Sequence, residues 1–233
     1  MSVAVKICGL SRPDMLEAAL EAGAAYVGLV FYEPSPRNVS LEQGEKLAAL
    51  ARGRATIVAL TVNASDALLR AIATRVRPDF LQAHGEETPE RVREMTELTG
   101  IPVIKAVKVK DSPDVDQARA YAGVAAMVLF DARAPDAIAD ALPGGNGIAF
   151  DWSLLESSDG NRQFMLSGGL DCSNIAEAIR ITGAPVVDVS SGVERAPGIK
   201  DAGLIRKFIE AARSARQKRP REQGPRGTRP PRN

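Results

Sequence analysis

Short apolar runs rich in β-branched residues alternate along the chain with longer segments whose apolar residues recur at helical spacing. The apolar runs predict eight strands, at Val3–Cys8, Tyr26–Phe31, Thr56–Val62, Phe80–His84, Val103–Val109, Ala126–Phe130, Phe164–Leu166 and Val186–Val189. The other segments predict helices at Asp14–Ala22, Leu41–Ala51, Asp66–Arg75, Pro89–Leu98, Val115–Tyr121, Asn174–Ile181 and Ala202–Ala215. Strand and helix thus succeed each other along most of the chain.

The predicted strands are mostly continuous apolar runs rather than alternating ones. This pattern is typical of a parallel sheet that helices cover on both faces. The repeated units fit an α/β fold, a closed (β/α)8 TIM barrel formed by a single domain over residues 1–215. The competing open, doubly wound sheet would place a Gly-x-Gly-x-x-Gly turn after the first strand. That turn reads Cys8-Gly9-Leu10-Ser11-Arg12, so the barrel is favoured.

Small residues follow the last two predicted strands. Gly168-Gly169 comes after Phe164–Leu166, and Ser190-Ser191-Gly192 comes after Val186–Val189. Such residues leave backbone N–H groups and hydroxyls open to a ligand, and barrels of this class often bind phosphate after strands seven and eight. The order of the elements therefore predicts a phosphate site, without identifying the molecule that carries the phosphate.

The composition is that of an ordinary globular protein, with 45% hydrophobic and 25% charged residues. No apolar run is long enough to cross a membrane, and the first residues do not form a signal peptide. Only two cysteines occur, Cys8 and Cys172, so no disulfide framework is expected. We therefore expect a protein of the reducing cytoplasm.

Charge is distributed unevenly along the chain. Residues 216–233 hold seven of the 30 basic residues and one of the 29 acidic residues, which leaves residues 1–215 with a net charge of −5. The same segment is rich in proline and nearly free of apolar residues, so we expect a disordered basic C-terminal tail. The tail could contact nucleic acid or an acidic partner, but the acidic body argues against nucleic acid as the main ligand.

Two reactive side chains stand at the C-terminal ends of predicted strands, where a barrel places its active site. Cys8, beside Lys6, is as much a candidate reactive thiol as a small buried hydrophobe. A lowered pKa would let its thiolate accept a proton near neutral pH. Asp131 follows a buried apolar run, where an unpaired carboxylate is costly. We favour a catalytic acid over a helix N-cap at Asp131, because Pro135 disfavours a helix that starts there.

Three further side chains are candidates for substrate binding. His84, the only histidine, ends the fourth strand and is a candidate ligand contact or alternative base. Asp188 lies two positions before Ser190 and points to the same side of the eighth strand. Arg37 follows the second strand in a proline-rich loop and is a candidate for binding a substrate carboxylate through two hydrogen bonds, the alternative being a surface arginine.

Neither a metal site nor a cofactor is predicted. One histidine and two distant cysteines cannot form a usual zinc site, and no nucleotide-binding motif occurs. The residues alone therefore indicate acid–base chemistry without a cofactor on a small phosphorylated molecule. They do not distinguish a monomer from a homodimer.

Together, these motifs resemble those of the phosphoribosylanthranilate isomerase family. The matching segments are Lys6-Ile7-Cys8-Gly9-Leu10, Ser35-Pro36-Arg37, Gln82-x-His84-Gly85, Leu129-Phe130-Asp131-Ala132, Gly144-Gly145-x-Gly147 with Phe150-Asp151-Trp152, Gly168-Gly169-Leu170 with Asn174, and residues 188–194 through Gly198 and Lys200-Asp201. They occur in the family's order from about Lys6 to Phe208, and their combination is highly specific although each alone is weak. Ala83, Asn146 and Ser167 depart from the family's pattern, but no proposed catalytic group is lost.

The resemblance implies a tryptophan-pathway enzyme that carries out an Amadori rearrangement. It implies that Asp131 is the general acid that opens the sugar ring of N-(5-phosphoribosyl)anthranilate. It also implies that Cys8 is the general base at C2 of the sugar. Arg37 is implied as the ligand of the anthranilate carboxylate, and the backbone of Gly168-Gly169 and Ser191-Gly192 as the phosphate cradle.

Two other hypotheses compete with the isomerase. A histidine-pathway sugar isomerase shares the phosphate-binding barrel, but it uses a carboxylate on the first strand, where this chain has Cys8. A non-catalytic phosphate-binding barrel with a nucleic-acid-binding tail predicts no turnover. It also predicts a salt-dependent affinity for DNA or RNA that is lost on truncation at Arg216.

Overall fold

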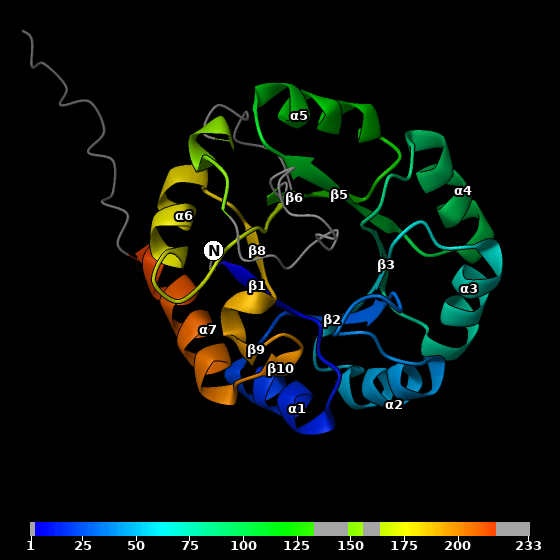
Figure 1. Ribbon diagram of the computed structural model, residues 1–233, viewed down its shortest axis with the longest axis horizontal. Helices are drawn as coiled ribbons and strands as arrows, with labels where there is room; N and C mark the ends of the chain where they lie inside the picture. Colours follow the sequence, from blue (N-terminus) through cyan, green and yellow to red (C-terminus); the bar gives the residue numbers. More distant parts are fainter. Residues whose placement is uncertain (1–2, 133–148, 156–163, 218–233) are drawn as a thin grey trace, which may run out of the picture.

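The computed structural model describes residues 3–132, 149–155 and 164–217, and eight parallel strands in this part of the chain close into a barrel. The strands are β1 (Ala4–Cys8), β2 (Tyr26–Phe31), β3 (Thr56–Thr61), β4 (Phe80–Ala83), β5 (Val103–Val109), β6 (Met127–Ala132), β7 (Phe164–Leu166) and β8 (Val186–Val189). Each strand pairs with the next, and β8 pairs with β1. The predicted (β/α)8 TIM barrel is therefore confirmed (Figure 1).

Helices surround the strands on the outside of the barrel (Figure 1). They are α1 (Pro13–Ala22), α2 (Leu41–Ala51), α3 (Asp66–Ala71), α4 (Pro89–Thr99), α5 (Ser112–Gln117), α6 (Ile175–Thr182) and α7 (Ala202–Gln217). Shorter helical turns are η1 (Ile72–Val76), η2 (Ala118–Tyr121), η3 (Trp152–Leu155) and η4 (Ser191–Val193). The last helix, α7, packs against both α1 and α6 and so completes the ring.

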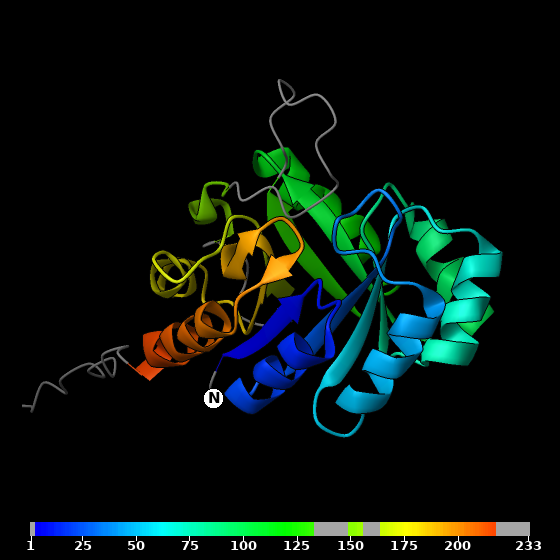
Figure 2. The same cartoon turned by 60° about the horizontal axis from the view of Figure 1, so that its bottom comes forward.

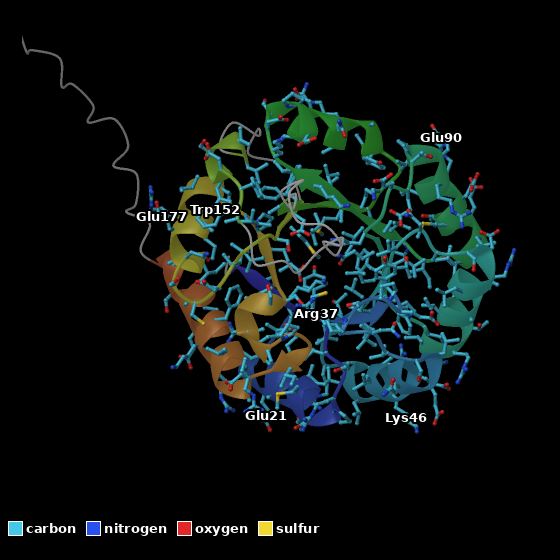
Figure 3. All side chains as sticks on the ribbon, in the orientation of Figure 1. Glu21, Arg37, Lys46, Glu90, Trp152 and Glu177 are labelled. Atoms are coloured by element: carbon cyan, nitrogen blue, oxygen red, sulfur yellow. The ribbon has the colours of Figure 1, made fainter. Side chains whose placement is uncertain are left out.

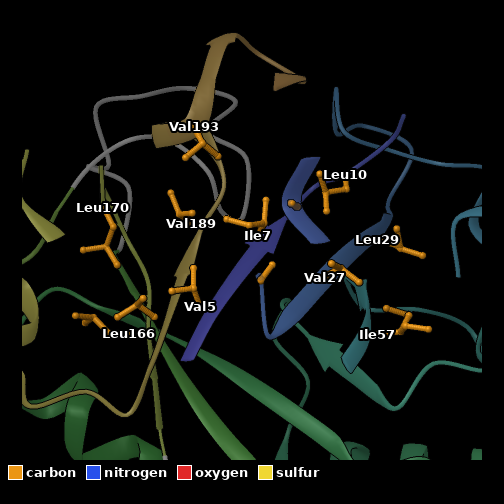
Figure 4. Packing of buried hydrophobic residues seen from close by; sticks show 14 of the residues in the cluster. Val5, Ile7, Leu10, Val27, Leu29, Ile57, Leu166, Leu170, Val189 and Val193 are labelled. Atoms are coloured by element: carbon orange, nitrogen blue, oxygen red, sulfur yellow. The ribbon is translucent and has the colours of Figure 1, made fainter. Parts of the chain in front are cut away.

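Side chains alternate between the two faces of each strand, as a pleated strand requires. On β5, Ile104 and Ala106 belong to the cluster inside the barrel, whereas Val103 and Val107 belong to the outer cluster under the helices. Figure 4 shows part of this outer layer, including Ile7 of β1. Both faces of the strands are therefore buried, which accounts for the continuous apolar runs in the sequence.

The same alternation directs polar residues at the strand ends toward the barrel axis. Leu129 and Val186 belong to the inner cluster, so Asp131 and Asp188, two positions further along β6 and β8, point to the same side. On β1, Ala4 packs against the inner cluster, and Cys8, an even number of positions further along, points to the same side. The pattern of apolar positions thus fixes which polar side chains reach the mouth of the barrel.

A short antiparallel hairpin follows β8 and was not predicted from the sequence. Its strands are β9 (Glu194–Ala196) and β10 (Ile199–Lys200). In Figure 2 the hairpin lies at the end of the barrel toward which the β1 arrow points. It approaches the loop after β2 closely, since a Cβ on Gly198 would lie 2.5 Å from the backbone oxygen of Pro36. The hairpin therefore forms one wall of the C-terminal mouth.

Two predicted helices differ in form from the expectation. The helix predicted over Asp66–Arg75 is α3 followed by the π-helical turn η1, and the one predicted over Val115–Tyr121 is α5 followed by η2. The final helix continues to Gln217, two residues into the predicted basic tail, and the rest of residues 216–233 lies outside the described part. No helix of the described residues is long and apolar enough to span a membrane.

Candidate active site

Cys8 occupies the last position of β1 and is buried in the barrel mouth, where it packs against Val30 and Leu60. Gly28 on the neighbouring strand β2 makes room for the thiol. A Cβ on Gly28 would lie 2.8 Å from Cys8 Sγ and 3.2 Å from Lys6 Nζ. The thiol and the ammonium of Lys6 therefore lie side by side over the same glycine.

The shift in the pKa of Cys8 is opposite to the lowered value that the sequence suggested. Burial raises the pKa of the thiol more than the positive charges of Lys6 and Lys200 lower it, and the carboxylate of Asp188 adds to the increase. The sequence shows the lysine beside the cysteine but not how completely the barrel removes water from the thiol. Cys8 is therefore mainly a neutral thiol at neutral pH. The charges of the two lysines limit the increase in its pKa, so they favour the thiolate without reversing the effect of burial.

Lys6 and Asp188 form an ion pair across the β1–β8 junction. Lys6 is completely buried, and its Nζ donates to Asp188 Oδ1 at 2.9 Å. Ser167 Oγ donates to the other carboxylate oxygen at 3.3 Å. Burial is the largest single effect on the pKa of Lys6 and lowers it, but the charges and hydrogen bonds of Asp188 and Cys8 together raise it by more, so the ammonium stays charged. Asp188, which the sequence offered as a substrate ligand, thus holds the cation beside Cys8.

Asp131 lies within β6, which extends to Ala132, two residues beyond the predicted strand end. The side chain is buried, and its Oδ2 is 3.1 Å from His84 Nε2. The backbone N–H of Ala132 donates to Oδ1 at 3.1 Å. This position inside a strand excludes the alternative of a helix N-cap, and both oxygens of the carboxyl group are held.

His84 follows β4 directly and is buried beside Asp131. Gln82 Nε2 lies 2.7 Å from His84 Nδ1. With the amide nitrogen of Gln82 as the donor, Nδ1 accepts, and Nε2 carries the hydrogen that it donates to Asp131. The two residues that the sequence predicted separately, at the ends of β4 and β6, therefore form one hydrogen-bonded unit.

Arg37 is buried and bound to a carboxylate of the protein itself. Its Nε donates to Glu194 Oε1 at 2.8 Å, and its Nη2 donates to Glu194 Oε2 at 2.9 Å. Figure 3 shows Arg37 inside the ring of helices, over the mouth of the barrel. The alternative of an ordinary surface arginine is therefore wrong. The bidentate pair fixes the guanidinium in one orientation.

Glu194 also binds the ammonium of Lys200, at 2.7 Å from Nζ to Oε1. Lys200 Nζ donates further to the backbone oxygen of Ser190 at 2.9 Å and to its Oγ at 3.1 Å, and Ser190 Oγ donates to Cys8 O at 3.2 Å. Burial lowers the pKa of Lys200, against the opposing effect of Glu194. The hairpin thus connects the arginine loop, the end of β8 and the end of β1.

The loops after β7 and β8 have the backbone geometry expected of a phosphate cradle. Gly168 and Gly169 adopt φ angles of +88° and +61°, a region that side chains disfavour. Gly192 approaches the neighbouring loop so closely that a Cβ there would lie 2.0 Å from Leu170 O. No backbone hydrogen bond joins the N–H groups of Gly168-Gly169 or Ser191-Gly192 to another described residue. These N–H groups are therefore available to an anion.

The structure brings the predicted site residues to the same end of the barrel, in three groups. The acid–histidine unit lies on β4 and β6, the glycine loops lie after β7 and β8, and the thiol lies on β1 between β8 and the arginine loop of β2. Sequence reasoning missed Glu194 and Lys200, although both lie in matching motif segments. Glu194 and Arg37 are 157 positions apart, and no local pattern connects them.

Two further predictions from the sequence concern a glycine-rich motif and metal binding. The motif Gly144-Gly145-x-Gly147 lies outside the described residues. Within the described residues, no group of three or more histidine, cysteine, aspartate or glutamate side chains could hold a metal ion.

Comparisons with known proteins point to one family. A profile of the N-(5'phosphoribosyl)anthranilate (PRA) isomerase family matches residues 5–211. The N-(5'-phosphoribosyl)anthranilate isomerase of Bradyrhizobium sp. (strain ORS 278) is 53% identical over 218 residues, which cover 93% of this chain and 98% of the relative. The matches therefore run through all the strand ends that carry the site.

Solved structures agree with this family. The phosphoribosyl anthranilate isomerase from Thermotoga maritima has a TM-score of 0.81 and 36% identity, over 91% of this chain and 99% of that chain. A phosphoribosyl anthranilate isomerase in complex with reduced 1-(o-carboxyphenylamino)-1-deoxyribulose 5-phosphate has a TM-score of 0.78 and 35% identity, with the same coverage of both chains. From its sequence, its barrel and these relatives, the chain belongs to the N-(5'-phosphoribosyl)anthranilate isomerase family.

Proposed function

We propose that this protein converts N-(5'-phosphoribosyl)anthranilate to 1-(2-carboxyphenylamino)-1-deoxyribulose 5-phosphate, the Amadori rearrangement of tryptophan biosynthesis. The observation that carries the proposal is the placement of Cys8 and Asp131 at the inward-facing ends of β1 and β6. Two strands, β7 and β8, separate them around the barrel, and the loops that follow these strands form the glycine-rich cradle. A phosphorylated sugar held by the cradle lies between an acid on one side and a base on the other.

Asp131 is the general acid in this proposal. It donates a proton to the ring oxygen of the furanose, and the C1–O bond breaks to give a protonated Schiff base between C1 and the anthranilate nitrogen. His84 and the N–H of Ala132 hold the carboxyl group in one orientation, which a proton donor needs. A positioned acid of this kind contributes on the order of 10²–10⁴-fold to the rate.

Cys8 is the general base. Its thiolate removes the proton from C2 of the Schiff base, and the electrons of the C2–H bond form the C1=C2 bond of an enolamine. The enolamine then gains a proton at C1 and loses one from the C2 hydroxyl, which gives the ketone. Lys6, fixed by Asp188, is the nearby cation that favours the thiolate. The apolar contacts with Val30 and Leu60 keep water away from the reacting carbon.

Arg37 binds the carboxylate of the anthranilate moiety, and the backbone of Gly168-Gly169 and Ser191-Gly192 binds the phosphate. Support for the first role is the fixed orientation of the buried guanidinium, and support for the second is the set of backbone N–H groups that have no backbone acceptor in the described part of the chain. The two anionic ends of the substrate are then held on opposite sides of Cys8, because β2 and β8 are the two neighbours of β1.

The test follows the fluorescence of the anthranilate moiety after purified protein is added to freshly made N-(5'-phosphoribosyl)anthranilate. We expect rapid loss of signal with the wild type and none above background with Cys8→Ala. Cys172→Ala is the matched control, because the other free cysteine is half-buried on the outer side, near Leu204. Activity that survives in Cys8→Ala would assign the base to another group, first His84. No turnover by folded wild type would refute the isomerase and leave a non-catalytic phosphate-binding barrel.

We also propose that the protein acts in the cytoplasm, as a monomer or a homodimer, on a small phosphorylated substrate and not on nucleic acid. Support for the location is that both cysteines are free thiols. Support for the substrate class is the net charge of −5 on residues 1–215, which repels a polyanion. Sedimentation of the purified protein decides its oligomeric state.

A further inference from the structure

Lys105 is a buried cation on the side of β5 that faces away from the active site. Its neighbours Ile104 and Ala106 point into the barrel, whereas Lys105 points outward with Val103 and Val107. Its side chain is only 3% exposed. Burying an ammonium in this apolar layer costs free energy unless its hydrogens are bound. The hydrogen-bond partners of Lys105 therefore indicate its role.

The ammonium of Lys105 binds the two backbone carbonyls that flank His84. Nζ donates to Gly85 O at 2.6 Å and to Ala83 O at 3.3 Å, and it forms an ion pair with Glu87 Oε2 at 2.8 Å. The cation also lies 5.9 Å from the centre of the Tyr121 ring. The carbonyl groups of the residues before and after the histidine are therefore attached to one point on the neighbouring strand.

The carboxylate of Glu87 binds one backbone N–H of the same loop and one of the loop after β3. It accepts from Gly85 N at 2.9 Å and from Asn63 N at 2.8 Å, and only 2% of its side chain is exposed. Tyr121 Oη donates to the backbone oxygen of Glu87 at 2.9 Å. Both polar groups of Gly85, its N–H and its C=O, are thus bound by the Lys105–Glu87 pair.

We propose that the Lys105–Glu87 pair positions His84, and through it the Asp131 carboxyl, for proton transfer. The catalytic consequence rests on the isomerase function proposed above, whereas the positioning itself is a property of the fold. His84 has no other anchor of this kind: beyond its ring contacts with Gln82 and Asp131, its backbone N–H donates to Thr61 O at 2.9 Å among the described residues. Lys105 touches neither the substrate site nor Asp131, so it is a positioning residue.

Stability alone does not account for the pair. A buried ion pair can often be replaced by apolar side chains of similar volume without loss of stability. What apolar side chains cannot supply is the set of hydrogen bonds to the peptide groups on either side of the histidine. The position of the imidazole is therefore what the pair adds to the fold.

The test uses the fact that His84 is the only histidine of the chain. In protein without a histidine tag, ¹⁵N-labelled histidine gives ring signals from His84 alone, and these report its tautomer and its order. The double variant Lys105→Met/Glu87→Gln removes both charges together, so no unpaired charge stays buried. We expect its His84 signals to change from one tautomer to a broadened or averaged pattern. We also expect kcat to fall at least tenfold with KM unchanged, because Arg37 and the glycine loops are not affected.

Leu69→Ala is the control for a general loss of stability, since Leu69 is buried on α3 away from the site. Wild-type His84 signals and kcat in the folded double variant would overturn the proposal. So would a loss of kcat no larger than that of Leu69→Ala with unchanged His84 signals. Tyr121→Phe, which removes only the hydroxyl bound to Glu87 O, is the milder variant and should shift the same signals in the same direction, even if the double variant does not fold. No turnover by the wild type would refute the isomerase but leave the ¹⁵N result to decide the positioning.

Discussion

Glu194 binds the guanidinium of Arg37 through both carboxylate oxygens, at 2.8 and 2.9 Å, while one of these oxygens also binds Lys200 at 2.7 Å. One carboxylate is thus shared as a counter-charge by two buried cations. Burial is the largest single effect on the pKa of Glu194 and raises it, but the hydrogen bonds and charges of Arg37 and Lys200 together lower it by more. The orientation of Arg37 toward a substrate therefore depends on the hairpin that carries Glu194.

Glu194→Gln should weaken both the fold and the binding of substrate. The variant removes the carboxylate charge that Arg37 and Lys200 share, and loss of one partner from a buried pair costs roughly 3–5 kcal/mol in the free energy of unfolding. Because the glutamine amide repels one guanidinium N–H, Arg37 should also lose its fixed orientation, and KM should rise more than kcat falls. Urea denaturation and steady-state kinetics measure the two effects. An unchanged KM in the folded variant would show that Glu194 does not orient Arg37.

The same residue predicts a dependence of stability on pH. A carboxyl group whose pKa in the folded protein lies below its unfolded value contributes stability that is present above the unfolded value and is lost as the pH falls through the folded value. The ordinary value for Glu194 is 4.5, and its pKa in the fold is lower. The difference in unfolding free energy between wild type and Glu194→Gln should therefore be full at pH 7 and shrink below about pH 4.5. A difference that grows on acidification would reverse the assigned sign.

Gly9 tests the placement of Arg37 by steric means. A Cβ on Gly9 would lie 2.6 Å from Arg37 Cδ, and the guanidinium beyond that carbon is held by Glu194. Gly9→Ala should therefore displace Arg37 and raise KM roughly tenfold or more, since an ångström of misplacement is enough for such an effect. Steady-state kinetics over a range of substrate concentrations gives KM and kcat separately.

Gly53 provides the matched control for that substitution. Its φ of +77° nearly equals the +75° of Gly9, but a Cβ there would have no atom within 4 Å. Gly9→Ala and Gly53→Ala should therefore lose a similar amount of stability from backbone strain, about 1–2 kcal/mol. Only Gly9→Ala should change KM. If both variants changed KM equally, the clash with Arg37 would not be the cause.

The inward-facing residues at the strand ends were predictable from the sequence, because side chains alternate between the two faces of a strand. Cys8, Asp131, His84 and Arg37 stand at or just after the ends of apolar runs, and the barrel brings these ends together. The partners of these residues were not predictable in the same way. Glu194 reaches Arg37 from a hairpin that carries no strong strand pattern, and its contact depends on packing between distant loops.

The sequence also did not predict the direction of the shift in the pKa of Cys8 or the ion-pair partner of Asp188. The sequence places Lys6 two positions from Cys8, which suggested a lowered thiol pKa, but the sign depends on how much water the fold excludes. Asp188 was expected to face the ligand, and its parity was right, yet its carboxylate is bound to Lys6 at 2.9 Å. The position of a residue along a strand gives the direction of its side chain. Its role depends on the charged groups that the fold places next to it.

Lys6→Met should raise the pKa of Cys8 further. Burial already raises it above the ordinary 9.0, and the charge of Lys6 is the largest effect in the opposite direction. Below that pKa the thiolate fraction grows about tenfold per pH unit, so alkylation of Cys8 by iodoacetamide should speed up from pH 7 to pH 9 in the wild type and be slower at each pH in the variant.

The control for this substitution is Lys46→Met, which removes the same charge from an exposed pair with Glu42. Its alkylation rate should match that of the wild type. In the wild type, kcat/KM for the isomerisation should also rise with pH across the neutral range, because the base is the thiolate. A rate of alkylation that does not change in Lys6→Met would mean that Lys6 has no electrostatic effect on the thiol.

Asp131→Asn should abolish the acid without disturbing the fold. The amide keeps the size of the carboxyl group, and its oxygen can still accept from His84 or from the N–H of Ala132, so the unfolding free energy should change by only about 1 kcal/mol. Without a transferable proton, kcat should fall on the order of 10²–10⁴-fold. Substrate binding through Arg37 and the glycine loops is not affected, so KM should stay within a few-fold of the wild-type value.

Asp116→Asn serves as its control, because Asp116 is an exposed residue on α5 that pairs only with Arg119 at 3.3 Å among the described residues. That variant should retain wild-type kcat. Single-turnover fluorescence on excess enzyme separates the chemical step from product release, and the loss in Asp131→Asn should appear in the chemical step. If the variant turned over at more than a tenth of the wild-type rate, the ring oxygen would receive its proton from another group, and the hydrogen bond to Asp131 would make His84 the first to examine.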